Sequence, residues 1–197
     1  MKIKFQYNKT SLQRLKKQLA IRERALPTLK NKESALRMEV KNAKDQAGYL
    51  DQKLGEKMQA YKRMVQLWSE FKPNLIRIDD VKASTKKIAG VNTPILENIS
   101  FKTLPFSIFN NPKWYLDGIN ILQELSRISI EKEFFVRKMQ LLNHARKKTT
   151  QKVNLYEKVQ IPGFQDAIRK INRFLEDEEN LSKSSQKIVK GRKEKAA

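Results

Sequence analysis

The sequence predicts a mainly all-α protein in which two long helices pair as an antiparallel coiled coil around a small central insert that holds a short β-hairpin. Three observations carry this prediction: a seven-residue apolar repeat in the first third, a proline-bounded β-branched stretch in the middle, and helical periodicity in the last part. Only six Gly and six Pro occur in 197 residues, which is few for a loop-rich β or wound α/β fold. The expected segments are residues 1–72, 73–112 and 113–197.

Apolar residues recur every seven positions from Leu12 to Phe71. In the two interleaved series that begin at Leu12 and Leu15, 15 of 18 positions are apolar, well above the 39% of the whole chain. Such a repeat is typical of the a and d positions of a coiled coil, and it predicts one helix over residues 11–71. The expected seam consists of Leu12, Leu15, Leu19, Leu26, Leu29, Leu36, Val40, Leu50 and Leu54.

Local signals mark the ends of this first helix. A hydroxyl at Thr10 or Ser11 accepts from the free N–H groups of a first turn, so we expect one of them to be the N-cap. Lys72 precedes Pro73, and a proline disfavours helix at the residue before it. Pro27 lies within the repeat without shifting it, so we expect a kink there while the seam continues.

The stretch 73–112 holds four of the six prolines and several β-branched runs. It predicts short strands or a hairpin, with the turn around Asn92-Thr93-Pro94. Aromatic residues follow, and they either close the insert over the helices or form a docking surface for a partner. These aromatic residues are Phe101, Phe106, Phe109, Trp114 and Tyr115.

Helical periodicity resumes after Asn110-Asn111-Pro112, a cap followed by proline at the first helical position. An apolar stripe then steps by seven from Ile121 to Tyr156. We expect Pro162 to interrupt this helix and a second apolar face to run from Phe164 to Ile188. The residues 190–195 are expected to form a frayed tail.

Composition excludes several kinds of chemistry. With no Cys and the single His144, neither a disulfide framework nor a zinc site is expected, and the acidic run 176–179 is expected to be a solvated helix face. No glycine lies in a phosphate-binding frame, so we expect no catalytic residue, no cofactor, no metal and no ATP hydrolysis by this chain alone. Because no signal segment or membrane span is present, a soluble intracellular protein is expected.

The charge points to acidic partners. The chain carries 42 Lys and Arg against 21 Asp and Glu, a net charge of +21. Such a chain attracts nucleic acid, an anionic membrane surface or an acidic protein cavity, and charge alone does not choose among them. Nucleic-acid modules also present stacking aromatics or a groove-reading helix, and neither pattern is evident.

The segment QKVNLYEKVQIPGF, residues 151–164, resembles the C-terminal signature of the D subunit of V-type and A-type ATPases. The pattern Val-Asn-x-x-Glu-x-x-x-Ile-Pro corresponds here to Val153, Asn154, Glu157, Ile161 and Pro162. The segments LKNKESAL (29–36) and KIAGVNTPILE (87–97) are similar to two further family motifs, in the same order. The chain departs from the family pattern at 8–10, at 33–34 and in the degraded tail motif of 176–187.

This resemblance implies a non-catalytic central-stalk protein, a rotor shaft that couples ATP hydrolysis or synthesis in a hexamer of A and B subunits to ion translocation across a membrane. It further implies two kinds of partner: the F subunit of the stalk, and a C/d-type subunit that seats the shaft on the membrane ring. No specific nucleic acid and no direct membrane insertion are expected. The expected location is cytoplasmic, peripheral to the cytoplasmic face of a membrane.

Long basic side chains on the terminal half are the expected contacts with the hexamer, by position and charge. The main alternative is a basic helical hairpin that binds nucleic acid or associates with ribosomes, and an isolated coiled-coil scaffold is a third possibility. The expected contact residues are Lys16, Lys17, Arg22, Arg24, Arg169, Lys170 and Arg173.

Overall fold

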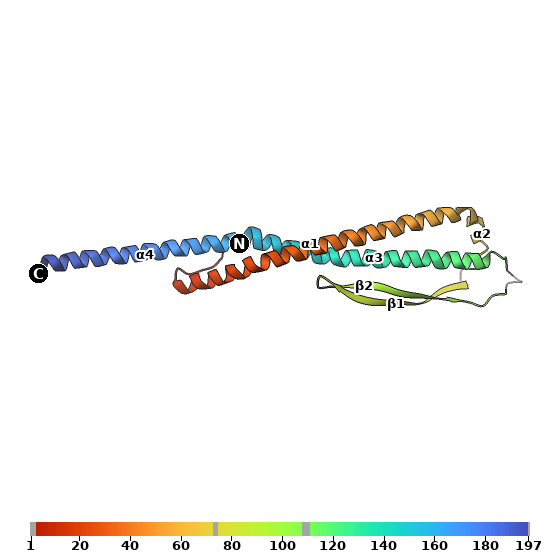
Figure 1. Cartoon of the computed structure of the whole chain (residues 1–197), viewed down its shortest axis with the longest axis horizontal. Coiled ribbons are helices and arrows are strands. Elements are labelled where there is room, and N and C mark those ends of the chain that lie inside the picture. The colour runs from red at the N-terminus through yellow and green to blue at the C-terminus, as the bar shows by residue number, and fades with distance from the viewer. Residues whose placement is uncertain (1–2, 73–74, 108–110, 197) are drawn as a thin grey trace. The chain divides into compact units, whose positions relative to one another are not determined.

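The computed structural model describes residues 3–72, 75–107 and 111–196. It divides into two compact units, whose helices and strands are labelled in Figure 1. The terminal unit comprises Met1–Glu33 and Lys148–Ala197, and the central unit comprises Ser34–Lys147. The protein is mainly α-helical with one two-stranded sheet, so the predicted fold class is confirmed.

Helix α1 spans Lys9–Ala60 and includes Pro27. The backbone continues through a 3-10 turn, Tyr61–Met64, and the short helix α2, Val65–Trp68. Asn8 caps α1, because its Oδ1 accepts from the Ser11 N–H at 2.6 Å. The prediction of Thr10 or Ser11 as N-cap is therefore wrong, and Ser11 Oγ instead accepts from the Gln6 N–H at 3.3 Å.

Helix α3, Tyr115–Leu155, runs antiparallel to α1 in the central unit. Two ion pairs fix this direction: Lys57 Nζ lies 2.6 Å from Glu124 Oε1, and Lys132 Nζ lies 2.6 Å from Asp51 Oδ1. Burial follows the seven-residue repeat, since Leu36 on α1 and Leu142 on α3 are both 0% exposed. Among the seam residues, Leu15, Leu36 and Leu50 are buried and the others are half-buried.

Strands β1, Ile76–Ile88, and β2, Val91–Thr103, form an antiparallel hairpin, and each strand is 13 residues long. Its turn is Ala89-Gly90, where φ is 48° and 81°. Positive φ at both central residues is the geometry of a two-residue type I′ turn. The predicted turn at Asn92-Thr93-Pro94 is therefore wrong.

Residues 92–94 lie instead within β2. Thr93 is 0% exposed, and its Oγ1 donates to the Lys86 carbonyl at 2.9 Å. Pro94 lies opposite Thr85 in the pairing register. A strand tolerates proline where its missing N–H is not needed by a partner strand, and each strand of a two-stranded sheet has one such free edge.

An aromatic cluster closes the central unit where α2, the chain after it and the start of α3 meet. Phe71 and Tyr115 are 8% and 3% exposed, and their rings lie 5.3 Å apart. Trp114 packs against Trp68 and Phe71, and the Tyr115 hydroxyl donates to the Glu70 carbonyl. Gly118 is needed here, because a Cβ would lie 3.0 Å from the Trp114 ring.

These contacts favour the closing role over the docking role for the aromatic residues of the insert. Phe106 also packs on Tyr115, while Phe101 lies under the Arg127 guanidinium at 5.5 Å. Phe109 lies outside the described residues.

In the terminal unit, a π-helical turn, Tyr156–Gln160, joins α3 to helix α4, Ile161–Ala196. Pro162 thus falls in the first turn of α4, where a missing N–H costs little. The expected interruption at Pro162 is wrong, because the helix passes instead through a wider turn just before this residue. Helix α4 continues to Ala196, through the residues 190–195 that are expected to fray.

The core of the terminal unit brings both ends of the sequence together. Leu15 of α1 packs with Phe164, Ala167 and Ile171 of α4, and the segment before α1 adds Ile3 and Phe5. Gly163 allows this approach, because a Cβ there would lie 3.2 Å from Ile3 Cδ1.

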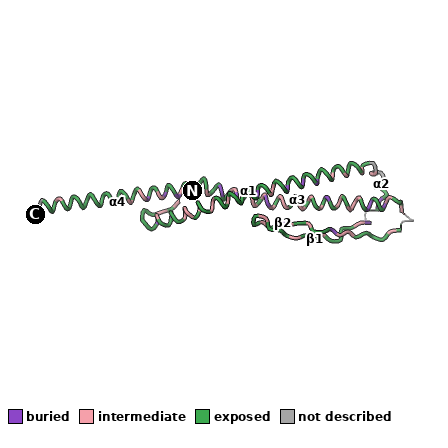
Figure 2. The backbone as a smooth tube through the Cα atoms, viewed as in Figure 1, coloured by how far each residue is buried: buried purple, intermediate pink, exposed green. Residues whose placement is uncertain are grey.

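Beyond this core, α4 has no cover within the described part of the chain. Every residue from Glu176 to Lys190 is exposed (Figure 2). The apolar side chains on this stretch include Leu181, Ile188 and Val189, which are 70%, 58% and 53% exposed. Ion pairs between residues four apart, such as Glu179 with Lys183 at 2.7 Å, support the helix locally.

Candidate functional site

The terminal unit carries a basic surface. It contains 22 Lys and Arg against nine Asp and Glu. Of the seven expected contact residues, all except Arg22 are exposed, and they lie on α1 and α4 within this one unit. Long exposed cations of this kind suit an acidic protein surface.

Three cations of this set act on one carboxylate of α4. Lys170 Nζ lies 2.9 Å from Asp166 Oδ2. The hydrogen bond from Lys170, its charge, and the charges of Arg169 and Arg173 hold the pKa of Asp166 below its usual value. Three positive side chains therefore lie around Asp166 on this part of α4.

Arg22 differs from the other expected contact residues because its guanidinium is used inside the terminal unit. Its Nε donates to Gln160 Oε1 at 2.6 Å, and its Nη1 donates to the Gln18 carbonyl at 2.9 Å. Its Cζ lies 4.5 Å from the centre of the Phe164 ring and 5.9 Å from that of Tyr156. These contacts join α1 to the π turn and to the start of α4.

Two further polar residues at apolar-repeat positions make contacts that the sequence analysis did not foresee. Glu33 Oε1 accepts from Thr150 Oγ1 at 2.8 Å in the terminal unit. Lys57 pairs with Glu124 in the central unit, and the hydrogen bond that Lys57 donates to the Glu124 carboxylate raises the pKa of Lys57. The signal was available, because Arg22, Glu33 and Lys57 are the three polar positions of the repeat.

The family-signature residues surround the π turn. Val153 is 5% exposed, and Ile161 is half-buried. Glu157 is exposed and pairs with Lys30 of α1 at 2.7 Å, while Asn154 and Pro162 are exposed. The signature therefore encodes a packed helical junction, with no set of groups arranged for catalysis among these residues.

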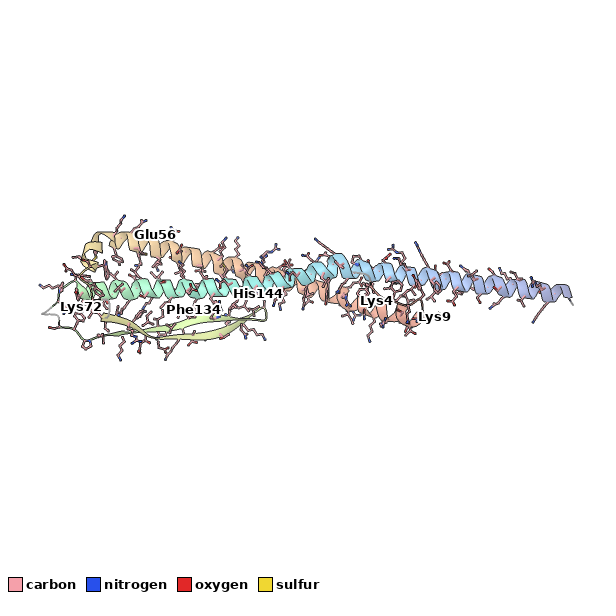
Figure 3. All side chains as sticks on the ribbon, turned by 180° about the vertical axis from the view of Figure 1, so that it is seen from behind. Lys4, Lys9, Glu56, Lys72, Phe134 and His144 are labelled. Carbon is pink, nitrogen blue, oxygen red and sulfur yellow. The ribbon has the colours of Figure 1, made fainter. Side chains whose placement is uncertain are left out.

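In the central unit, a groove of about 250 Å³ lies between β2 and α3. Phe134 of α3 points toward the strands, and His144 is exposed further along the same helix (Figure 3). Glu131 and Lys138 add one charge of each sign. The groove is lined by Pro94, Ile95, Leu96, Glu131, Phe134, Phe135 and Lys138.

Two features are absent from the part of the chain that the structure describes. Within residues 3–72, 75–107 and 111–196, no three His, Asp or Glu side chains gather as a metal site would require. Among the described helices, none has the length and apolar content of a membrane-spanning segment.

Comparison with known proteins decides the family. The family model for the D subunit of ATP synthase matches residues 11–191. The chain belongs to the family of ATP synthase D subunits. The V-type ATP synthase D subunit of Borreliella burgdorferi is 32% identical over 192 residues, covering 95% of this chain and 94% of that protein.

Two chlamydial relatives agree with this assignment. The V-type ATP synthase D subunit of Chlamydia muridarum is 27% identical over 195 residues and 96% of each chain. That of Chlamydia abortus is 28% identical over 203 residues, covering 98% of this chain and 97% of the relative. The family match includes the seam, the hairpin and the π turn, so the resemblance is confirmed over nearly the whole chain.

Proposed function

We propose that this chain is a non-catalytic central-stalk subunit, the rotor shaft of a V/A-type rotary ATPase. It couples ATP hydrolysis or synthesis in the catalytic hexamer to ion translocation across the membrane. The observation that carries this proposal is the match to the family of ATP synthase D subunits over residues 11–191. Paired long helices without a phosphate-binding loop are consistent with a mechanical role.

The terminal unit is the part proposed to enter the hexamer of A and B subunits. Its exposed cations would contact acidic surfaces there: Lys16, Lys17, Arg24, Arg169, Lys170 and Arg173, with Arg22 behind them. The uncovered stretch of α4 supports the same assignment, because an isolated helix of about 15 residues is marginal in water without a partner. Exposed Leu181, Ile188 and Val189 offer apolar contacts to such a partner.

The proposed coupling between ATP chemistry and rotation arises because the shaft contacts the catalytic interfaces unequally. A shaft without threefold symmetry touches three otherwise equivalent catalytic interfaces differently, so each interface favours a different nucleotide state. The influence is reciprocal, because nucleotide states that favour one shaft angle are themselves favoured by that angle. The chain needs no cofactor, metal or catalytic residue for this role.

The remaining partners are assigned to the central unit. The F subunit of the stalk and the C/d-type subunit that seats the shaft on the membrane ring are proposed to bind there. The protein would then lie in the cytoplasm, peripheral to the membrane face.

A charge-reversal experiment tests this function. Lys16, Lys17, Arg169 and Lys170 are changed together to Glu, and ATP-driven ion transport is measured per ATP hydrolysed in the reconstituted complex. We expect coupling or assembly with the hexamer to weaken, because four attractive contacts become repulsive. Binding of stalk partners at the central unit should remain intact.

The matched control reverses four exposed lysines of the central unit, Lys41, Lys44, Lys53 and Lys62. It changes net charge equally and should leave assembly with the hexamer intact. Coupling and hexamer assembly in the terminal-unit variant equal to those of the native complex would contradict the proposal. Tight RNA binding by the native chain that persists at physiological salt would favour the nucleic-acid alternative. Nonspecific RNA binding by a basic surface should instead weaken steeply as salt rises.

A further inference from the structure

The apolar repeat of the second long helix contains one step that is a residue too long. Thr149 and Tyr156 are seven residues apart, and Phe164 and Ile171 are seven apart, but Tyr156 and Phe164 are eight apart. Thr149, Phe164 and Ile171 are 8%, 5% and 0% exposed, so these residues face the interior on both sides of the long step. In a regular α-helix, one extra residue turns the following side chains by about 100° away from the seam.

The π turn absorbs this extra residue. The Ile161 N–H donates to the Tyr156 carbonyl, a bond between residues five apart rather than four. The wider turn therefore holds one residue more than an α turn, and Phe164 returns to the face that Leu15 covers. Pro162 favours this place for the wide turn, because its ring clashes with the carbonyl four residues earlier in a regular helix.

Arg22 of α1 contacts both ends of the π turn. Its Nε donates to Gln160, the last residue of the turn, and its guanidinium lies near the ring of Tyr156, the first. The same group stacks on Phe164, the first buried residue after the turn, at 4.5 Å. A planar guanidinium can donate and stack at once, whereas lysine supplies only a point charge.

We propose that Arg22 is a positioning residue that holds the extra residue of the helix at the π turn and thereby fixes the rotational setting of α4 against α1. Without the contacts of Arg22, backbone hydrogen bonds between residues four apart and five apart replace one another along the helix. The π turn, and with it the extra residue, then shifts to a neighbouring position. Each move turns the intervening side chains off the seam. The proposal concerns the chain's own conformation and stands independently of the rotor function.

Amide hydrogen exchange on the full chain tests the first part. In Arg22→Ala, we expect residues 157–168 to exchange about tenfold faster, since a charge-assisted hydrogen bond and a stacking contact are lost. Exchange in the hairpin, residues 76–103, should not change. The control is Arg24→Ala, which removes the same charge from an exposed position of the same helix and should have no effect.

Arg22→Lys separates local from global effects. It keeps the charge and most of the stem but loses the planar fork, so faster exchange should again be confined to 157–168. Faster exchange spread evenly over the terminal unit in both Arg22 variants would contradict the proposal.

The decisive experiment compares Arg22→Ala in the native chain with the same substitution in a chain that lacks Val159. Val159 is 38% exposed, and removing it shortens the step between Tyr156 and Phe164 (native numbering) from eight residues to seven. In this background Arg22→Ala should no longer speed exchange, because no extra residue remains to be held. An equal effect in both backgrounds would mean that Arg22 merely packs on Phe164, and would overturn the proposal.

A matched deletion controls for chain shortening. Removing Lys170, which lies in regular α4, should turn Ile171 away from the core and lower the midpoint of thermal unfolding. Deletion of Val159 should lower that midpoint clearly less. If the two deletions destabilise the protein equally, the π turn does not correct the repeat and the proposal fails.

Discussion

Three polar residues occupy positions of the apolar repeat in α1, and each makes a polar contact with the helical segment that packs against it. Arg22 reaches Gln160, Glu33 reaches Thr150, and Lys57 reaches Glu124. A seam made only of apolar side chains tolerates shifts along the helix axis, whereas polar pairs at seam positions favour one register. These three residues therefore specify which turns of the helices face each other within each unit.

The Lys57–Glu124 pair predicts a pH dependence of stability. Because Glu124 raises the pKa of Lys57 above 10.5, folding favours the protonated lysine. Its contribution is fully present below 10.5, the unfolded value, and is lost as pH rises through the higher folded pKa. The difference in urea midpoint between the native protein and Lys57→Met should be constant from neutral pH to about pH 10.5 and should decrease at higher pH.

Lys53→Met is the control for this titration, because Lys53 is exposed one turn earlier on the same helix. Its difference from the native protein should stay flat over the same pH range. A flat difference for Lys57→Met as well would show that the ion pair is not maintained in solution.

The sequence shows that these polar residues interrupt the apolar repeat, but it does not show which groups they contact. Position and charge, which are visible in a sequence, place Arg22 among the expected hexamer contacts, whereas a ring 4.5 Å away on another helix is not visible there. The cap of α1 shows the same limit. Asn8, Thr10 and Ser11 are all good capping residues, and only the backbone geometry selects Asn8.

Among the secondary-structure elements, the long helices were predictable and their irregularities were only partly so. A repeat sustained from Leu12 to Phe71 leaves little choice except a helix. The π turn was detectable as the eight-residue step from Tyr156 to Phe164, but Pro162 two residues earlier suggested a break instead. The hairpin was expected, yet Asn92-Thr93-Pro94 is a stronger turn signal than Ala89-Gly90, so its turn was misplaced.

The hairpin turn predicts a stabilising substitution. Ala89 has φ of 48°, which costs a residue with a Cβ about 1 kcal/mol and which asparagine adopts more readily. Ala89→Asn should slow amide exchange across residues 76–103, and Ala89→Val should speed it. The control Ala83→Asn, at an exposed strand position, should weaken the hairpin. Faster exchange in Ala89→Asn would exclude a type I′ turn.

For the whole molecule, the net charge and the uncovered part of α4 are compatible with the proposed function. A chain of net charge +21 with an uncovered helix from Glu176 to Lys190 needs contacts that it does not itself supply. We expect the proposed partner to offer both acidic and apolar side chains to this helix. Nucleic acid would satisfy the charge but not the exposed Leu181, Ile188 and Val189.

The central claim is that this chain works as the shaft inside a nucleotide-binding hexamer. Affinity purification of the tagged full chain from the cells that encode it, after nuclease treatment, tests this claim most directly when the co-purified proteins are quantified by mass spectrometry. We expect two large nucleotide-binding subunits, each at about three copies per copy of this chain, together with smaller stalk subunits. Recovery of ribosomal or RNA-binding proteins without those two subunits would contradict it.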